Sequence, residues 1–372
     1  MNQEMKELKI DIMEKQFAVH DTALRWFNSY LEQRTQFYCV GTEISTSIQI
    51  KYGVPQGSVA GPVEFICYTE ELEETISLFS VRHHFYADDA QLLARTTLRT
   101  IDTCRQEIEK CVASIHVWCS ARRLQLNPDK TELIWFGSRH FLQQLPPNKS
   151  TIQVCGVHVK PMNCVRNLGV LLDSELNMKI HISKVVSVGF FHLRRLRQLR
   201  KILDRNLRQR LVSALILSRI DYCNTVFAGL PASTLQPLQR LINAAARYVA
   251  DLGPFDSVTG TLKELHWLPI KQRITYKLCI MMHAVVFEAA PVYIRGMVVS
   301  VADLPGRERL RSASSGTFDV PRVRTHYGSQ AFSVAGPRAW NALPADLWIG
   351  ISTRDVFKRN LTTFLFNEAY RS

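Results

Sequence analysis

The feature that most constrains this chain is a pair of adjacent aspartates, Asp88 and Asp89. Apolar runs flank the pair at 85–86 and 92–93, a pattern that predicts two strands joined by a tight turn. Neighbouring side chains diverge along a strand, whereas at the tip of a hairpin both carboxylates can project toward one small volume. Two like charges held that close are costly unless a cation neutralises them, and Mg²⁺ prefers such hard oxygen ligands. The alternative is an ordinary solvated acidic turn.

The length of the chain indicates how many domains to expect, and its net charge indicates the kind of partner. A chain of 372 residues exceeds the usual size of one hydrophobic core, so we expect two or three domains. Hydrophobic residues make up 46% of the chain, which is enough for packed cores. The formal net charge of +13 favours a polyanionic partner such as nucleic acid over an acidic small molecule.

Cysteine spacing and hydropathy argue against a zinc site and a membrane span. The nine cysteines form no CxxC pair and no Cys/His cluster with zinc-ligand spacing. Cys104, Cys111 and Cys119 are spaced as core residues near one face of a helix. An odd count without a signal peptide predicts a reducing, intracellular location, either nuclear or cytoplasmic. Polar residues and a proline interrupt the most apolar tract, 278–294, so we expect no membrane partner.

Hydrophobic periodicity predicts an α+β unit followed by long helices. The expected elements of the first part are a helix over 1–35, a hairpin over 36–50 around Gly41, a Pro/Gly loop over 54–58, a helix over 59–76, the Asp-Asp hairpin, a helix from Asp102 or Thr103 to about Arg123, a strand over 131–136, a hairpin over 151–160 around Gly156, and a strand over 168–173. Beyond them we expect one or two helices from 182 to about 211, helices over 212–227, 235–249 and 262–290, a turn-punctuated stretch over 331–344, and a closing helix from Thr353. Residues 36–173 thus predict a β-α-β-α-β unit with the carboxylates on a central hairpin.

The first long helices carry a basic face opposite an apolar one. The basic residues are Arg194, Arg195, Arg197, Arg200, Lys201, Arg205, Arg208 and Arg210. Within this stretch only Asp204 offsets them, and that imbalance favours a phosphate backbone as partner. The alternative is an ordinary solvated helix face.

Five short motifs follow one another at compatible spacing. They are residues 26–31 (WFNSYL), 53–62 (GVPQGSVAGP), 85–89 (FYADD), 126–132 (LNPDKTE) and 168–173 (LGVLLD). In this order they resemble the reverse transcriptase of LINE-type, jockey-like non-LTR retrotransposons, and residues 336–344 resemble the tail of the same polyproteins. The resemblance implies a partial right-hand polymerase palm, an antiparallel sheet with helices, over 1–175. It further implies a basic helical thumb over 176–252 and a mixed C-terminal extension of unknown role over 253–372.

By this resemblance the palm holds two Mg²⁺ ions with three acidic positions, and the reaction adds deoxynucleotides to a primer 3′-hydroxyl. Asp88 would be the principal metal ligand and Asp89 its supporting neighbour. Lys130 matches a lysine that passes a proton to pyrophosphate or neutralises it, although an exposed loop cation is the alternative. The implied partners are an RNA template, a DNA primer or RNA–DNA duplex, and deoxynucleoside triphosphates.

The resemblance also implies contacts to the substrates. Tyr86 and Ala87 would lie beside the primer end. The incoming nucleotide and the template base would pack against Pro55, Gln56, Gly57 and Ser58. Residues 168–173 match the primer grip, and the basic helices match the thumb that follows the duplex through its phosphates.

The departures from the family pattern predict a chain that does not polymerise alone. The helix ending in residues 26–31 begins almost at Met1, so we expect the strand with the first catalytic aspartate, the fingers and the upstream endonuclease to be absent. Glu64 places a charge where the family has an apolar residue. Three alternatives stay open: a nucleic-acid-binding remnant without chemistry, a decayed reading frame without a stable product, and a gene model cut short upstream of Met1.

Overall fold

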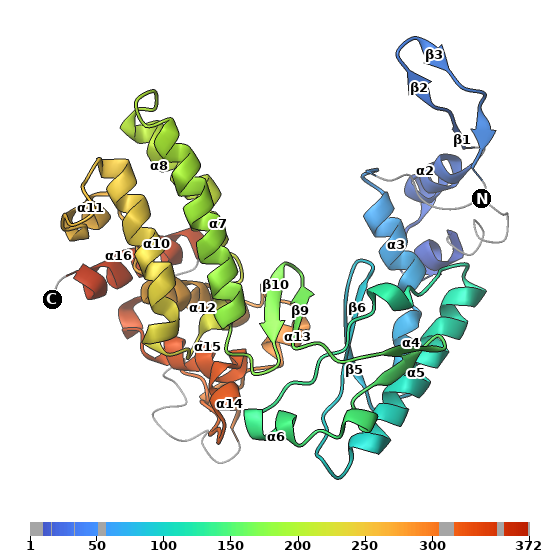
Figure 1. Ribbon diagram of the computed structural model, residues 1–372. Helices are drawn as coiled ribbons and strands as arrows, with labels where there is room; N and C mark the ends of the chain where they lie inside the picture. The colour runs from blue at the N-terminus through green and yellow to red at the C-terminus, as the bar shows by residue number, and fades with distance from the viewer. Residues whose placement is uncertain are drawn as a thin grey trace. The chain divides into compact units, whose positions relative to one another are not determined.

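The chain forms two compact units, Met1–Met162 and Asn163–Ser372. The computed structural model describes residues 10–15, 17–32, 34–50, 57–304, 316–347 and 353–370. Helices dominate both units, and each unit also contains short antiparallel hairpins, so the chain is α+β (Figure 1). Among the described residues, none of the helices combines the length and hydropathy that crossing a bilayer requires.

Unit 1 is built around one long helix. Residues 10–15 are helical, and the elements that follow are α2 (Asp21–Leu31), β1 (Thr35–Gln36), β2 (Cys39–Val40), β3 (Glu43–Ile44), β4 (Ile48–Gln49), α3 (Gly61–Thr69), α4 (Leu72–Ser77), β5 (Arg82–Tyr86), β6 (Asp89–Leu93), α5 (Ile101–Ala121), η1 (Pro128–Lys130), α6 (Arg139–Gln143), η2 (Pro147–Lys149), β7 (Ile152–Val154) and β8 (Val157–Val159). One face of α5 buries Cys111 and Ile115 against α4 and the β5–β6 hairpin. An adjacent face buries Val112 against β7–β8. The helix α5 therefore supports the hairpin that carries the two aspartates.

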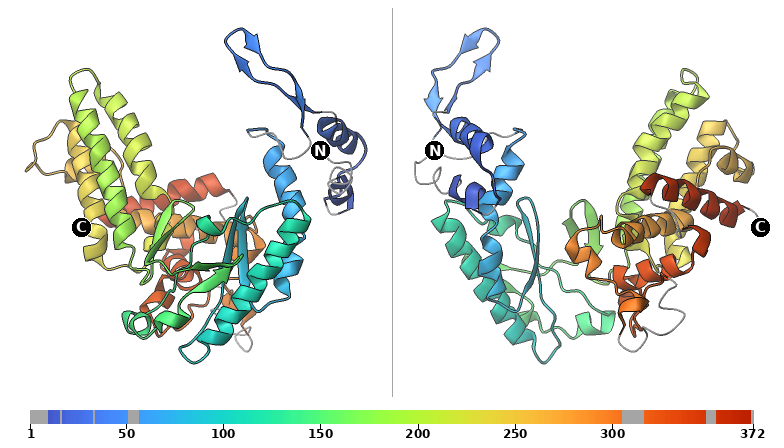
Figure 2. Two further views of the ribbon diagram at one scale, coloured as in Figure 1. Left: turned by 45° about the vertical axis from the view of Figure 1, so that its right-hand side comes forward. Right: turned by 180° about the vertical axis from the view of Figure 1, so that it is seen from behind.

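Unit 2 is mainly helical. Its elements are β9 (Cys164–Asn167), β10 (Val170–Asp173), α7 (Lys179–Gln198), α8 (Arg205–Val212), η3 (Ser213–Leu217), α9 (Ser218–Asp221), η4 (Asn224–Phe227), α10 (Ala232–Ala250), α11 (Thr259–Glu264), α12 (Ile270–Val286), α13 (Val292–Arg295), η5 (Val301–Asp303), α14 (His326–Gln330), α15 (Phe332–Asn341), η7 (Ala345–Leu347) and α16 (Arg354–Tyr370). The helices α7 and α10 lie side by side in every view (Figures 1 and 2). Their core continues past residue 252 into α11 and α12. A second core joins α12, α15 and α16, where the buried ring of His283 stacks between Phe287 and Phe357.

Several expected elements are confirmed. Hairpins form at Gly41 and at Gly156, each with a left-handed glycine in the turn. The strand expected over 168–173 is β10, which pairs with β9 across a turn at Leu168 and Gly169. Cys111 and Cys119 are buried on α5, and α16 closes the chain.

Three expected helices are interrupted. The helix expected over 1–35 breaks before α2, where Ala18 and Asp21 take left-handed backbone angles. The helix expected over 59–76 divides after Thr69, whose hydroxyl donates to the Phe65 carbonyl at 3.0 Å and competes with the helix ladder. The helix expected over 262–290 divides before Pro269, which cannot continue a helix from its N-terminal side.

Two further expectations are wrong. The strand expected over 131–136 is reduced to a single bridge between Leu133 and Pro161, and the Trp135 indole instead donates to the Ser150 carbonyl at 2.8 Å. The stretch over 331–344 contains the helix α15 although Pro337 lies inside it. Burial of its apolar face against α12 outweighs the low helix propensity of proline.

The close approach of α7 and α10 depends on Gly189, because a β-carbon there would overlap the Leu241 side chain. We expect Gly189→Ala to lower the free energy of unfolding by roughly 1–3 kcal/mol through overpacking. Gly260 lies in α11 with no atom within 4 Å of the corresponding position, so Gly260→Ala is a matched control. Urea unfolding measures both variants, and equal stabilities would contradict this packing account.

Candidate active site

The turn of the β5–β6 hairpin presents both aspartates. The strands pair antiparallel with Tyr86 opposite Asp89, so Ala87 and Asp88 form a two-residue turn. Ala87 has a left-handed φ of 53°, which suits such a tight chain reversal. Asp88 thus lies in the turn and Asp89 begins the returning strand, which confirms the hairpin expected from the sequence.

Alternating side chains anchor the hairpin on one face. Phe85 of β5 and Leu92 of β6 are half-buried in the core shared with α5. Successive side chains on a strand point to opposite faces, so the packing of Phe85 directs Tyr86 away from that core. Tyr86 is 62% exposed, and Asp88 and Asp89 are exposed as well. The acidic turn is therefore exposed, while Phe85 and Leu92 pack its strands against the core shared with α5.

Both carboxylates keep their oxygens available. Within the described part of the chain, no hydrogen bond or ion pair engages the side chain of Asp88 or Asp89. An exposed pair of adjacent carboxylates fits a hard cation such as Mg²⁺, which usually retains water and phosphate oxygens beside one or two carboxylates. In the same described ranges, no group of three or more His, Cys, Asp or Glu side chains is arranged to hold a metal ion.

The loop expected to meet the nucleotide is described only at its end. Pro55 and Gln56 lie outside the described residues. Gly57 has a φ of 77°, a left-handed conformation that favours glycine. The Ser58 hydroxyl accepts a hydrogen bond from the Gly61 amide at 3.0 Å, at the start of α3. Gly57 and Ser58 thus lead into α3, and the Ser58 side chain stabilises the first turn of that helix.

Lys130 lies at the end of the short helix η1. The Asn127 side chain accepts a hydrogen bond from the Asp129 amide at 3.0 Å, and the Thr131 hydroxyl donates to the Asn127 carbonyl at 2.9 Å. These bonds order the loop and leave the Lys130 side chain exposed. Its action on pyrophosphate stays a prediction.

Residues 8–172 match the family described as reverse transcriptase (RNA-dependent DNA polymerase). The match covers less than half of the chain, and within it the chain is similar to a reverse transcriptase domain. The matched range contains the acidic turn, the loop before α3 and Lys130. It also extends from unit 1 into the β9–β10 hairpin of unit 2.

Relatives from Drosophila melanogaster support the same family. The chain is 26% identical over 258 residues to a probable RNA-directed DNA polymerase from transposon BS, an alignment that covers 66% of this chain and 28% of the relative. It is 27% identical over 159 residues to the probable enzyme from transposon X-element, covering 42% of this chain and 17% of the relative. The enzyme from mobile element jockey is 23% identical over 162 residues, again covering 42% and 17%. The jockey-like resemblance of the motifs is thereby confirmed, and the alignments span 28% of the length of the first relative and 17% of the other two.

The basic helices follow the range that matches reverse transcriptases. Arg194, Arg195 and Arg197 are exposed on α7, whereas Leu193 and Leu196 between and beside them are buried. The Arg195 guanidinium lies 5.8 Å from the centre of the Phe191 ring. Two further exposed cations, Arg200 and Lys201, lie in the connection from α7 to α8. Their role in nucleic-acid binding stays a prediction.

Three of the basic residues pair with carboxylates from other elements. Arg200 pairs with Asp251 after α10, and Arg205 pairs with Glu264 of α11 at 2.6 Å. The hydrogen bond from Arg205 lowers the pKa of the Glu264 carboxyl. Arg208 is only 12% exposed and donates to the Tyr248 carbonyl at 3.2 Å. These cations tie α8 to α10 and α11.

The carboxylates Asp251 and Glu264 were not anticipated from the sequence, because they lie more than 40 residues from their partners and no local spacing links them. Asp204, which was expected to offset the basic charge, instead accepts a hydrogen bond from the Leu207 amide at 2.7 Å and caps α8. Among the described residues, no ion pair engages Arg194, Arg197 or Lys201. We therefore expect these three cations to contact phosphates in preference to the paired Arg200, Arg205 and Arg208.

Removing two of these cations tests the proposed interface. We expect the double change Arg194→Gln and Arg197→Gln to weaken binding of an RNA–DNA duplex, and to reduce the slope of log affinity against log salt by about 2. Fluorescence anisotropy over a salt series measures both quantities. The matched control removes two exposed arginines of α15 and α16, Arg338→Gln and Arg359→Gln. An equal loss in the control would contradict a specific interface on α7.

Proposed function

We propose that the chain is part of an RNA-directed DNA polymerase that adds deoxynucleotides to the 3′-hydroxyl of a primer on an RNA template. The observation that carries this proposal is the exposed two-residue turn, with adjacent and unengaged carboxylates, inside a range that matches reverse transcriptases. The name RNA-directed DNA polymerase belongs to the three Drosophila relatives, and we extend it to this chain on that basis.

Asp88 and Asp89 are the residues that would hold Mg²⁺ in this proposal. Bound there, the metal would activate the primer hydroxyl and neutralise charge on the departing pyrophosphate. Asp88, in the turn, supplies the principal oxygen ligand, and Asp89 supports it from the first position of β6. Tyr86 and Ala87 lie next to them in the chain and would contact the primer end.

The other substrate contacts follow the family pattern. The loop residues Pro55, Gln56, Gly57 and Ser58 would meet the incoming nucleotide and template base. Through the Ser58–Gly61 hydrogen bond, the end of this loop is fixed to α3. Lys130 would supply positive charge or a proton to pyrophosphate. The domain division into palm, thumb and C-terminal extension belongs to the same proposal.

Nucleotide binding tests the function without requiring turnover. We expect the chain, bound to poly(rA) with a dideoxy-terminated oligo(dT) primer, to bind the complementary dTTP more tightly than dCTP in the presence of Mg²⁺. Asp88→Asn should weaken dTTP binding by about tenfold or more, because the phosphates lose their metal bridge. Isothermal calorimetry measures the affinities.

The matched control is Glu74→Gln, which removes an exposed carboxylate of α4. Equal losses in the two variants, or no preference for dTTP, would refute the proposal. With an extendable primer we expect no DNA synthesis by this chain alone, because the turn supplies two of the three acidic positions. Synthesis that Asp88→Asn abolishes would contradict that expectation while supporting the function.

A second candidate is a non-catalytic nucleic-acid-binding remnant. The exposed cations of α7 favour it, since they do not depend on the acidic turn. In that case duplex binding persists and complementary dTTP has no advantage in either the parent or Asp88→Asn.

A further inference from the structure

A hollow of about 530 Å³ lies at the end of the β5–β6 hairpin that is remote from the acidic turn. One side is formed by residues 96–99, which follow β6, and the other by α6 and its flanking residues. The five-residue strand β6 separates the hollow from the turn by roughly 17 Å. The hollow is therefore distinct from the proposed polymerase site.

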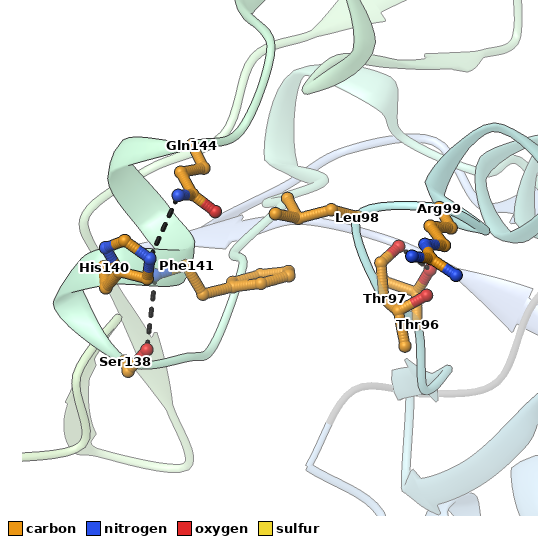
Figure 3. Close-up of a pocket in the computed structure, with 8 residues that line it drawn as sticks. All are labelled: Thr96, Thr97, Leu98, Arg99, Ser138, His140, Phe141 and Gln144. Carbon is orange, nitrogen blue, oxygen red and sulfur yellow. Dashed lines mark hydrogen bonds between the residues drawn. The ribbon is translucent and has the colours of Figure 1, made fainter.

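The interior of the hollow is apolar between two polar sides. Leu98 and Phe141 point toward each other from opposite sides (Figure 3). Thr96, Thr97 and Arg99 lie on the side of Leu98, while His140 and Gln144 lie on the side of Phe141 and share a hydrogen bond of 3.0 Å. An aromatic ring with polar groups at its edges suits a flat, hydrogen-bonding ligand.

Both sides are held in place by local contacts. The Phe141 ring packs on Gly137, where a β-carbon would lie 2.6 Å from the ring. The Ser138 hydroxyl caps α6 by accepting from the Phe141 amide at 3.2 Å. On the opposite side, the Thr100 hydroxyl accepts from the Thr97 amide at 3.1 Å and contacts the Thr97 hydroxyl at 3.0 Å. The hollow is thus largely preformed, which lowers the entropic cost of binding.

One cation lines the hollow, and two more lie beside its lining residues in the chain. Arg99 lines the hollow, and Arg95 and Arg139 precede the lining residues Thr96 and His140 in the chain. All three are exposed, and none has an ion pair among the described residues. The nearby Asp102 carboxylate is neutralised by Lys149 at 2.5 Å. With one arginine and no carboxylate among its lining residues, the hollow favours an anion and disfavours a metal cation.

We propose that this hollow holds an unpaired nucleotide of an RNA strand, with the base against Phe141 and Leu98 and a phosphate near Arg99. The choice of RNA rests on the proposed polymerase function. A single nucleotide suits the size of the hollow, and stacking on an aromatic ring requires a base that is not buried in a duplex. The site would retain the single-stranded template outside the region that is copied.

Binding of a short oligo(U) strand tests this inference on the full chain. We expect Phe141→Leu, which keeps apolar bulk but removes the ring, and Arg99→Gln each to weaken oligo(U) binding by about fivefold or more. Binding of a blunt RNA–DNA duplex should change by less than about twofold, because a duplex offers no unpaired base. Thermal unfolding of each variant establishes that it is folded.

The matched control is Lys110→Gln on the exposed side of α5. Unchanged oligo(U) binding in Phe141→Leu, or an equal loss of oligo(U) and duplex binding, would overturn the inference. Absence of oligo(U) binding by the parent chain would overturn it too. The proposed polymerase function is tested separately, since it predicts loss of dTTP binding in Asp88→Asn and no change in oligo(U) binding.

Discussion

The register of the β5–β6 pair is the constraint on which the candidate active site depends. Because Tyr86 lies opposite Asp89, the chain reverses within Ala87 and Asp88, and the two carboxylates stay adjacent at the surface. A shift of one residue would move Phe85 out of the core and Tyr86 into it. Burial of Phe85 and Leu92 against α5 opposes that shift, so packing on one face of the hairpin maintains the charge density at its turn.

Some arginines of unit 2 join its helices to one another, while others are exposed and able to bind phosphates. Three arginines make contacts within the fold. Arg200 pairs with Asp251, Arg205 pairs with Glu264, and Arg208 donates a hydrogen bond to the Tyr248 carbonyl. Exposed pairs of this kind contribute little stability individually, but together they join α8 to α10 and α11. The exposed arginines Arg194 and Arg197 of α7 have no ion pair among the described residues and remain available to phosphates. Counting basic residues along the sequence overestimates the charge that is free to bind.

The sequence predicted those features that short-range chemistry determines. The turns at Gly41 and Gly156 place a glycine in a left-handed conformation, and the turn at the aspartate pair is a two-residue reversal. All three lie where expected. The helix through Pro337 could not be predicted, because packing of α15 against α12 overrides local propensity there. The break after Thr69 depends on which carbonyl its hydroxyl bonds, and residue spacing alone does not show that. The hollow at Phe141 gave no sequence signal, since its two sides come from separate segments and neither carries a motif.

Iron-directed cleavage tests most directly whether the turn binds divalent metal. Fe²⁺ can replace Mg²⁺ at oxygen sites and, with ascorbate and peroxide, generates radicals that cut the nearby backbone. The account predicts cleavage beside Asp88, suppressed by excess Mg²⁺ and lost when Asp88 and Asp89 are both changed to asparagine. Glu74→Gln should leave the cleavage intact. Cleavage that maps elsewhere, or that survives in the doubly substituted chain, would contradict a metal site at this turn.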